Sequence, residues 1–303
     1  MVHLFALLNT CLSFQNNANH NLNYLDIVND NKYDIKSETL IQNLQNDLAQ
    51  NSAVTLPSFL KPSVLQKLVD ESIANEDKAY YAGTSYHTIF MKPIDHNLHS
   101  NHICNRQVLT SKGCITTDLI PNISLLKVLY YDETFQQFLI KILGINNKDD
   151  NNSNGNLLYD YEDPLSSLTV HYAKDGQELG WHFDNSAFAI TLLLQKADEG
   201  GVFEFMPNIR QVNAQNNNDD SFKDCIKPEL ANVVEDVLDG KVLPKSLELN
   251  PGTLVLFRGR DSMHRVSKVI GDTIRILVVF AYNEVPGVRL DEERMMKHFG
   301  RIA

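Results

Sequence analysis

Apolar residues recur at helical spacing in the first half of the chain and at the spacing of short strands in the second. The change of period falls at Gly144, which stands where a helix C-cap is expected. A strand that begins at Ala53 is ended by Pro57, and Ser63-Val64-Leu65-Gln66 has the form of a capping box. The helices predicted in this half are Ser37–Leu48, Ser63–Ile73 and Ile123–Leu143.

After Gly144 the chain predicts mostly strands, separated by Gly, Asp and Pro. The predicted strands are Leu168–Tyr172, Phe188–Leu194, Val202–Met206, Thr253–Phe257, His264–Val269 and Thr273–Tyr282. Polar insertions at Asn146–Asn156 and Asn213–Asp220 and a short helix near Pro228–Leu238 interrupt them. Many short strands with long excursions favour an all-β core of the jelly-roll (double-stranded β-helix) type, with N-terminal helices packed on it.

The same patterns divide the chain into three parts. Residues 1–52 form a variable, Asn-rich segment, 53–145 a helical support region with possible substrate contacts, and 146–303 the jelly-roll core. Asp291–Lys297 predicts a charged helical tail, a solvated face able to close over a pocket.

Composition narrows the class of partner and the compartment. The 303 residues carry 27 Lys and Arg against 38 Asp and Glu, a formal net charge of −11, which argues against nucleic acid or an anionic membrane. Four cysteines without a C-x-x-C pair suit a reducing compartment. The apolar stretch Leu4–Leu8 lacks a basic start, so we expect a docked terminus and a cytoplasmic protein without a membrane span.

The pattern His182-x-Asp184, followed by His264, carries the chemistry. In an extended segment residues i and i+2 point to the same side, so His182 and Asp184 can converge on one point. A second histidine from a distant strand completes two imidazoles and one carboxylate on one face of a metal, the set expected for non-haem Fe(II) oxygenases. A lone His-x-Asp is also common on a half-buried strand, so the context decides.

Arg275 supplies that context, because it interrupts a strongly apolar predicted strand. A charged Arg there needs a partner, and a carboxylate ligand matches the guanidinium geometry. A salt bridge to an acid of the protein or exposure on an edge strand is the alternative.

In this order and on a strand-rich domain, these residues resemble the Fe(II)/2-oxoglutarate-dependent dioxygenase superfamily. The resemblance covers residues 53–303 and is strongest over 159–300. It is closest to the branch of free amino-acid hydroxylases related to the radical halogenases of lysine. The runs that carry this likeness are Asp163-Pro164, Leu179–Asp184, Thr191–Gln195, Gly201–Phe205 and Gly252–Arg260.

The resemblance implies a role for each matching position. His182, Asp184 and His264 would hold Fe(II), and Arg275 would bind the far carboxylate of 2-oxoglutarate. Tyr172 would help to hold this co-substrate, unless it is a half-buried strand tyrosine. With O2 the enzyme would hydroxylate a C–H bond and release succinate and CO2, with ascorbate as a possible support. In the halogenases a glycine replaces the carboxylate ligand, so Asp184 implies hydroxylation.

The expected substrate is a small molecule, most of all a free amino acid, which needs a cation for its carboxylate and an acid for its amine. Arg106 and Arg210 are candidate cations, although exposed Arg is the usual Arg. Asn185 is a third candidate, beside the metal ligands.

Three other interpretations stay open. A peptide side-chain hydroxylase, as in the prolyl hydroxylases, would show a long open groove, and a non-catalytic jelly-roll binding protein would have a degenerate triad. His96, His99 and His102 recur every three residues, which favours a polar exposed loop over a metal site. The sequence makes no prediction of oligomeric state.

Overall fold

The computed structural model describes residues 22–145, 158–210 and 226–303. The predictions for the chain up to residue 21, for both polar insertions and for Cys11 and Cys225 lie outside these residues. Among the described residues, no helix is both long and apolar enough to cross a membrane.

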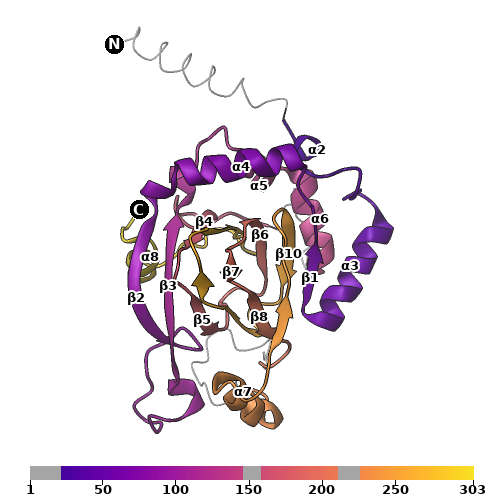
Figure 1. Cartoon of the computed structure of the whole chain (residues 1–303). Helices are drawn as coiled ribbons and strands as arrows, with labels where there is room; N and C mark the ends of the chain where they lie inside the picture. The colour runs from indigo at the N-terminus through magenta and orange to yellow at the C-terminus, as the bar shows by residue number, and fades with distance from the viewer. Residues whose placement is uncertain (1–21, 146–157, 211–225) are drawn as a thin grey trace.

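One curled antiparallel sheet of 11 strands forms the centre of the molecule (Figure 1). Its strands are β1 Ala53–Leu56, β2 Tyr80–Thr88, β3 Gln107–Ile115, β4 Leu168–Ala173, β5 Leu179–His182, β6 Ala189–Gln195, β8 Phe203–Met206, β9 Lys245–Leu247, β10 Thr253–Phe257, β11 Met263–Val266 and β13 Arg275–Phe280. Their order is β1-β10-β6-β13-β4-β3-β5-β11-β8-β9, and β2 pairs with β3. A separate pair joins β7 Glu199–Gly200 to β12 Val269–Ile270.

Helices from the N-terminal half of the chain cover one face of this sheet. The α-helices of the described residues are α2 Tyr24–Ile27, α3 Glu38–Asn51, α4 Pro62–Ala74, α5 Leu125–Tyr130, α6 Glu133–Leu143, α7 Ala231–Leu238 and α8 Glu292–Phe299. In Figure 1, α4 crosses one end of the strands, α3 and α6 stand beside β1, and α7 lies at the opposite end. The predicted all-β core of jelly-roll type with N-terminal helices packed on it is confirmed.

Alternation along the central strands separates the hydrophobic core from a cavity. On β4, Val170 and Tyr172 face the core that the helices complete, whereas Thr169 and His171 line the cavity. On β13, Val278 belongs to the core and Arg275 and Leu277 to the cavity. Successive side chains of a strand point to opposite faces, so each strand supplies both the core and the site.

Two helix predictions need correction, one in the middle of the helix and one at its start. The predicted helix Ile123–Leu143 is two helices, because Asp132 is extended and its side chain caps α6 by accepting from the Phe135 amide. The capping box predicted at Ser63 is wrong. The helix begins one residue earlier, at Pro62, which has no N–H to satisfy and a φ suited to the first helical position. Gly144 is the left-handed C-cap predicted for α6.

The region between α4 and α5 contains two nine-residue strands, β2 and β3, that the sequence patterns did not predict. β3 pairs with both β4 and β5 and so links the two halves of the curled sheet. The strand predicted at His264–Val269 is divided, since β11 ends at Val266 and Val269 pairs with β7 instead.

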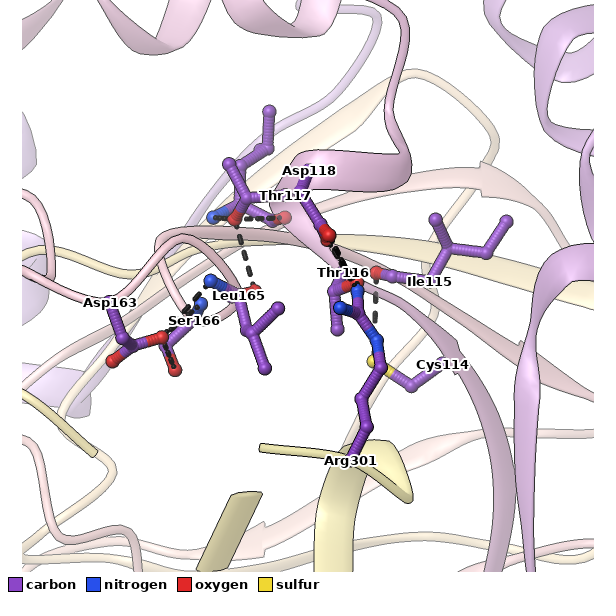
Figure 2. A network of polar contacts seen from close by, with 10 residues as sticks. Cys114, Ile115, Thr116, Thr117, Asp118, Asp163, Leu165, Ser166 and Arg301 are labelled. Carbon is purple, nitrogen blue, oxygen red and sulfur yellow. Dashed lines mark hydrogen bonds and ion pairs between the residues drawn. The ribbon is translucent and has the colours of Figure 1, made fainter. Parts of the chain in front are cut away.

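The C-terminal tail is a helix, as predicted, and α8 packs against β2 and β3. Contacts on either side anchor it. Before the helix, the Leu290 amide donates to Asp163 Oδ2 over 3.0 Å. After it, Arg301 donates to both carboxylate oxygens of Asp118, at 2.6 and 2.7 Å, and to Thr116 Oγ1, as Figure 2 shows.

Candidate active site

Three side chains from the ends of two neighbouring strands converge at one point. His182 ends β5 and His264 lies on β11, and these two residues are direct cross-strand partners. Asp184 follows β5 by two residues; its Oδ1 lies 3.5 Å from His182 Nε2 and its Oδ2 lies 3.4 Å from His264 Nε2. One ligand atom from each of the three residues lies within 4.8 Å of the others.

Backbone carbonyls orient both imidazoles. His182 Nδ1 donates to the carbonyl of Gly180 over 2.8 Å, and His264 Nδ1 donates to the carbonyl of Ser262 over 3.0 Å. With Nδ1 held by the backbone carbonyl, each ring directs Nε2 toward the carboxylate. This is how a metal-binding histidine is oriented in proteins.

The ionisation states of His182 and Asp184 favour binding of a cation at this point. Burial, and then the neighbouring His264, lower the pKa of His182 to about 4, so its ring is neutral at pH 7. Burial opposes ionisation of Asp184, but the two histidines hold the pKa of its carboxyl well below its ordinary value. Two imidazole nitrogens and a carboxylate therefore face one another. Such a donor set fits a divalent ion with open coordination positions.

The position of the Asp184 carboxylate requires a glycine at position 259. A Cβ built on Gly259 would lie 1.9 Å from Asp184 Oδ2, and the Asp184 amide donates to the Gly259 carbonyl. Because Gly259 has no side chain, the Asp184 carboxylate can lie against the backbone at this position.

Arg275 lies in the same cavity, with only 6% of its surface exposed. Its Nε donates to the Gly201 carbonyl over 2.9 Å, and burial lowers its pKa to about 10. Within the described part of the chain, no carboxylate forms an ion pair with its guanidinium. The predicted alternative of a salt bridge to an acid of the protein is therefore not found among these residues, and the terminal nitrogens stay available for an anion.

A cavity of about 360 Å³ contains these groups. Its wall beside the metal-binding residues is aromatic, because the rings of Phe257 and Phe203 lie 4.8 and 5.6 Å from the His264 ring. On the side of β2 and β3, Lys297, His298 and Phe299 of α8 complete the lining.

Three other residues that the sequence proposed for this site lie elsewhere. Tyr172 faces the helix side of the sheet, because it is one residue out of phase with His171, and its hydroxyl donates to the Ser72 carbonyl. Arg106 forms a surface ion pair with Asp239. The Arg210 guanidinium lies over the rings of Phe90 and Phe183, 5.9 and 5.8 Å from their centroids. None of the three lines the cavity, whereas Asn185 does.

Sequence reasoning missed several polar residues of the cavity. Lys112, from the unpredicted strand β3, donates to His171 Nδ1 over 3.0 Å, and His171 Nε2 in turn contacts Thr169 Oγ1 at 3.1 Å. His171 carried a usable signal, since it alternates with core residues on a strand that was predicted. Lys112 had none without β3. The histidine repeat forms no metal cluster in the described chain; His99 and His102 each accept a backbone amide.

Comparison with known proteins agrees with this geometry. The family model described as Halogenase D matches residues 154–298. The chain is similar in structure to the non-haem α-ketoglutarate-dependent epimerase SnoN of nogalamycin biosynthesis, with a TM-score of 0.52, 11% identity, and coverage of 81% of this chain and 84% of that one. It is also similar to the carbocyclase SnoK of the same biosynthesis, with a TM-score of 0.50, 12% identity, and coverage of 80% and 83%. No curated protein matches the sequence.

Proposed function

We propose that this chain is an iron(II)- and 2-oxoglutarate-dependent oxygenase that hydroxylates an unactivated C–H bond of a small molecule, a proposal that its fold and its family-model match support. One observation carries the proposal. A buried arginine without an acid partner among the described residues shares a cavity with two histidines and a carboxylate whose ligand atoms converge.

His182, Asp184 and His264 would hold iron(II), and Arg275 would bind the distal carboxylate of 2-oxoglutarate. When bound, iron and 2-oxoglutarate would supply the oxygen activation, with one oxygen atom of O2 going to succinate, the other to the product, and CO2 released. The protein orients the ligands through the Gly180 and Ser262 carbonyls and keeps bulk water away with the aromatic wall. Ascorbate would serve only to keep the iron reduced.

Hydroxylation is favoured over halogenation by Asp184. In the halogenases that the sequence resembles, a glycine stands at this position and leaves room for chloride, whereas here the Asp184 carboxylate is present and converges with the two histidines. The Halogenase D match makes halogenation the second candidate. The two activities differ in the product, which gains oxygen in one case and chlorine in the other.

A small molecule is favoured over a peptide because α8 covers one side of the cavity. The prediction of a free amino acid rested partly on Arg106 and Arg210, neither of which lines the cavity. A cytoplasmic location and the division of the chain at residues 52 and 145 remain predictions.

The test is a succinate-release screen across free amino acids, simple carboxylic acids and short peptides, with Fe(II), 2-oxoglutarate, O2 and chloride present. We expect one small molecule to stimulate succinate release in the wild type and none to do so in His264→Ala. Mass spectrometry of the product then separates a gain of oxygen from a gain of chlorine. Stimulation by peptides alone would favour the side-chain hydroxylase, and binding without any succinate would favour a non-catalytic binding protein.

A further inference from the structure

The cavity contains more positive charge than the co-substrate needs. Lys112, Arg275 and Lys297 line it, and Asp184 is the one carboxylate among the described lining residues. In the proposed function, Asp184 is neutralised by the metal. The two carboxylates of 2-oxoglutarate are taken by the metal and Arg275, which leaves the lysines without a described counter-ion.

Of the two lysines, Lys112 is the one held in place. Lys297 is exposed at the edge of the cavity, whereas Lys112 projects from β3 into it, partly buried. Its ammonium has three protons, and the described residues offer it one acceptor, His171 Nδ1 at 3.0 Å. Two N–H donors therefore remain for a ligand in the cavity.

The contact with His171 also fixes the direction of the donors. Because His171 accepts from Lys112 at Nδ1, its own proton lies on Nε2 and is donated to Thr169 Oγ1. Burial, with Lys112 as the next cause, holds the pKa of His171 well below its ordinary value, so the ring stays a neutral acceptor. The chain Lys112–His171–Thr169 is a rigid support for one cation on the inner face of the sheet.

Lys112 and Arg275 line the cavity from different strands. β4 lies between β3 and β13, so the two backbones are about two strand spacings, roughly 10 Å, apart. His171 of β4, which contacts Lys112, pairs with Leu277 of β13, two residues beyond Arg275. Lys112 lines the same cavity as the metal-binding residues.

We propose that Lys112 binds the carboxylate of the substrate, and that the substrate class is a small carboxylic acid whose binding does not depend on an ammonium group. The proposal rests on the proposed function, which assigns Arg275 to 2-oxoglutarate. It replaces the zwitterionic amino acid predicted from the sequence, because no second acid lines the described cavity to pair with an amine. Carboxylic acids and amino acids with a masked amine fit this charge pattern.

The experiment uses the Fe(II)- and 2-oxoglutarate-loaded protein without oxygen, titrated calorimetrically with butyrate, butyramide and 2-aminobutyrate at constant ionic strength. We expect wild type to bind butyrate at least tenfold more tightly than butyramide, and 2-aminobutyrate no more tightly than butyrate. Lys112→Met should weaken butyrate at least tenfold. Lys112→Arg should restore most of the affinity, and Lys268→Met, which removes an exposed lysine outside the cavity, should bind as wild type does.

Four results would overturn the inference. They are equal binding of butyrate and butyramide, unchanged butyrate binding in Lys112→Met, tenfold tighter binding of 2-aminobutyrate, and a 2-oxoglutarate requirement raised in Lys112→Met as much as in Arg275→Met. The last result would assign Lys112 to the co-substrate. Failure of the proposed function is separate, because it appears as a failure of wild type to form the loaded complex. The same titration of the metal-free protein then still decides the role of Lys112.

Discussion

Two backbone carbonyls determine how the metal-binding imidazoles are presented. Gly180 and Ser262 each stand two residues before a histidine and accept its Nδ1 proton. The tautomer and ring orientation are therefore set by local backbone geometry, independently of any bound ion. This explains why the three ligand atoms converge in the chain alone.

Arg275 should determine the affinity for 2-oxoglutarate. Replacing it with Met removes the bidentate donor while keeping most of the volume, so we expect the concentration of 2-oxoglutarate needed for half-maximal succinate release to rise at least tenfold. In Arg275→Lys, which keeps the charge, the required 2-oxoglutarate concentration should lie between those of wild type and Arg275→Met. An unchanged requirement in Arg275→Met would show that the co-substrate is anchored elsewhere.

His298 should make stability depend on pH. Burial, and then the charge of Lys112, lower its folded-state pKa to about 4, against an ordinary value near 6.5. Between these values the unfolded chain binds a proton that the folded chain does not, so the free energy of unfolding falls as the pH falls.

Urea unfolding of wild type and His298→Gln at pH 7 and pH 5, without added metal, measures this effect. We expect the variant to lose about 1 kcal/mol less than wild type, after allowance for the partial exposure of the ring. Identical losses would contradict the assignment.

Some residues of this site could be predicted from the sequence and others could not. His182, Asp184 and His264 were predictable because the i, i+2 spacing and the order along the chain carry the geometry. Tyr172 was misassigned because the alternation of side chains along its strand was overlooked. Its neighbour His171 faces the cavity, so Tyr172 faces the core. Arg106 and Arg210, the two candidate cations for the substrate, lie outside the cavity.

At the scale of elements, helices and buried strands were predicted correctly where the spacing of apolar residues was regular. Core strands such as β10 and β13 are dense in Val, Leu, Ile and Phe. β2 and β3 were missed because their sequences are mostly polar or small, with glycines at positions 83 and 113. One of their faces lines a polar cavity, so the hydrophobic alternation expected of a half-buried strand is absent. β3 was therefore not predicted from sequence because one of its faces lines the cavity and not the hydrophobic core.

The break between α5 and α6 should have a measurable energetic basis. Asp132 accepts the Phe135 amide at one carboxylate oxygen and the Tyr24 amide at the other, each over 2.9 Å. We expect Asp132→Ala to lower the free energy of unfolding by about 1–2 kcal/mol in urea denaturation. Asp132→Asn, which keeps the helix cap, should lose less. Equal stability of all three proteins would exclude a capping role.

At the scale of the whole molecule, the curl of the sheet is what assembles the site. β13, which carries Arg275, is separated from β11, which carries His264, by three strands in the hydrogen-bonding order, yet both line one cavity. The sequence predicted the fold class, but the closure depends on β3, which pairs with strands of both halves. α8, anchored by Asp163 and Arg301, then covers one side.

A metal that joins β5 to β11 should stabilise the fold as a whole. At a free concentration one hundred times its dissociation constant, an ion bound only by the folded chain adds about 2.7 kcal/mol. We expect Mn(II) to raise the melting temperature by roughly 5 °C, and EDTA to reverse the rise. His182→Ala should show no response to Mn(II). An equal rise in wild type and variant would mean that the ion binds elsewhere.

The central claim is that one ferrous ion and one 2-oxoglutarate are held together in this cavity. An anaerobic titration with Fe(II) at saturating 2-oxoglutarate measures it through the weak visible charge-transfer band of the chelate. We expect a band that saturates at one equivalent of iron per chain and is absent in His182→Ala. A wild-type protein without the band, or a His182→Ala protein with the same band, would contradict it.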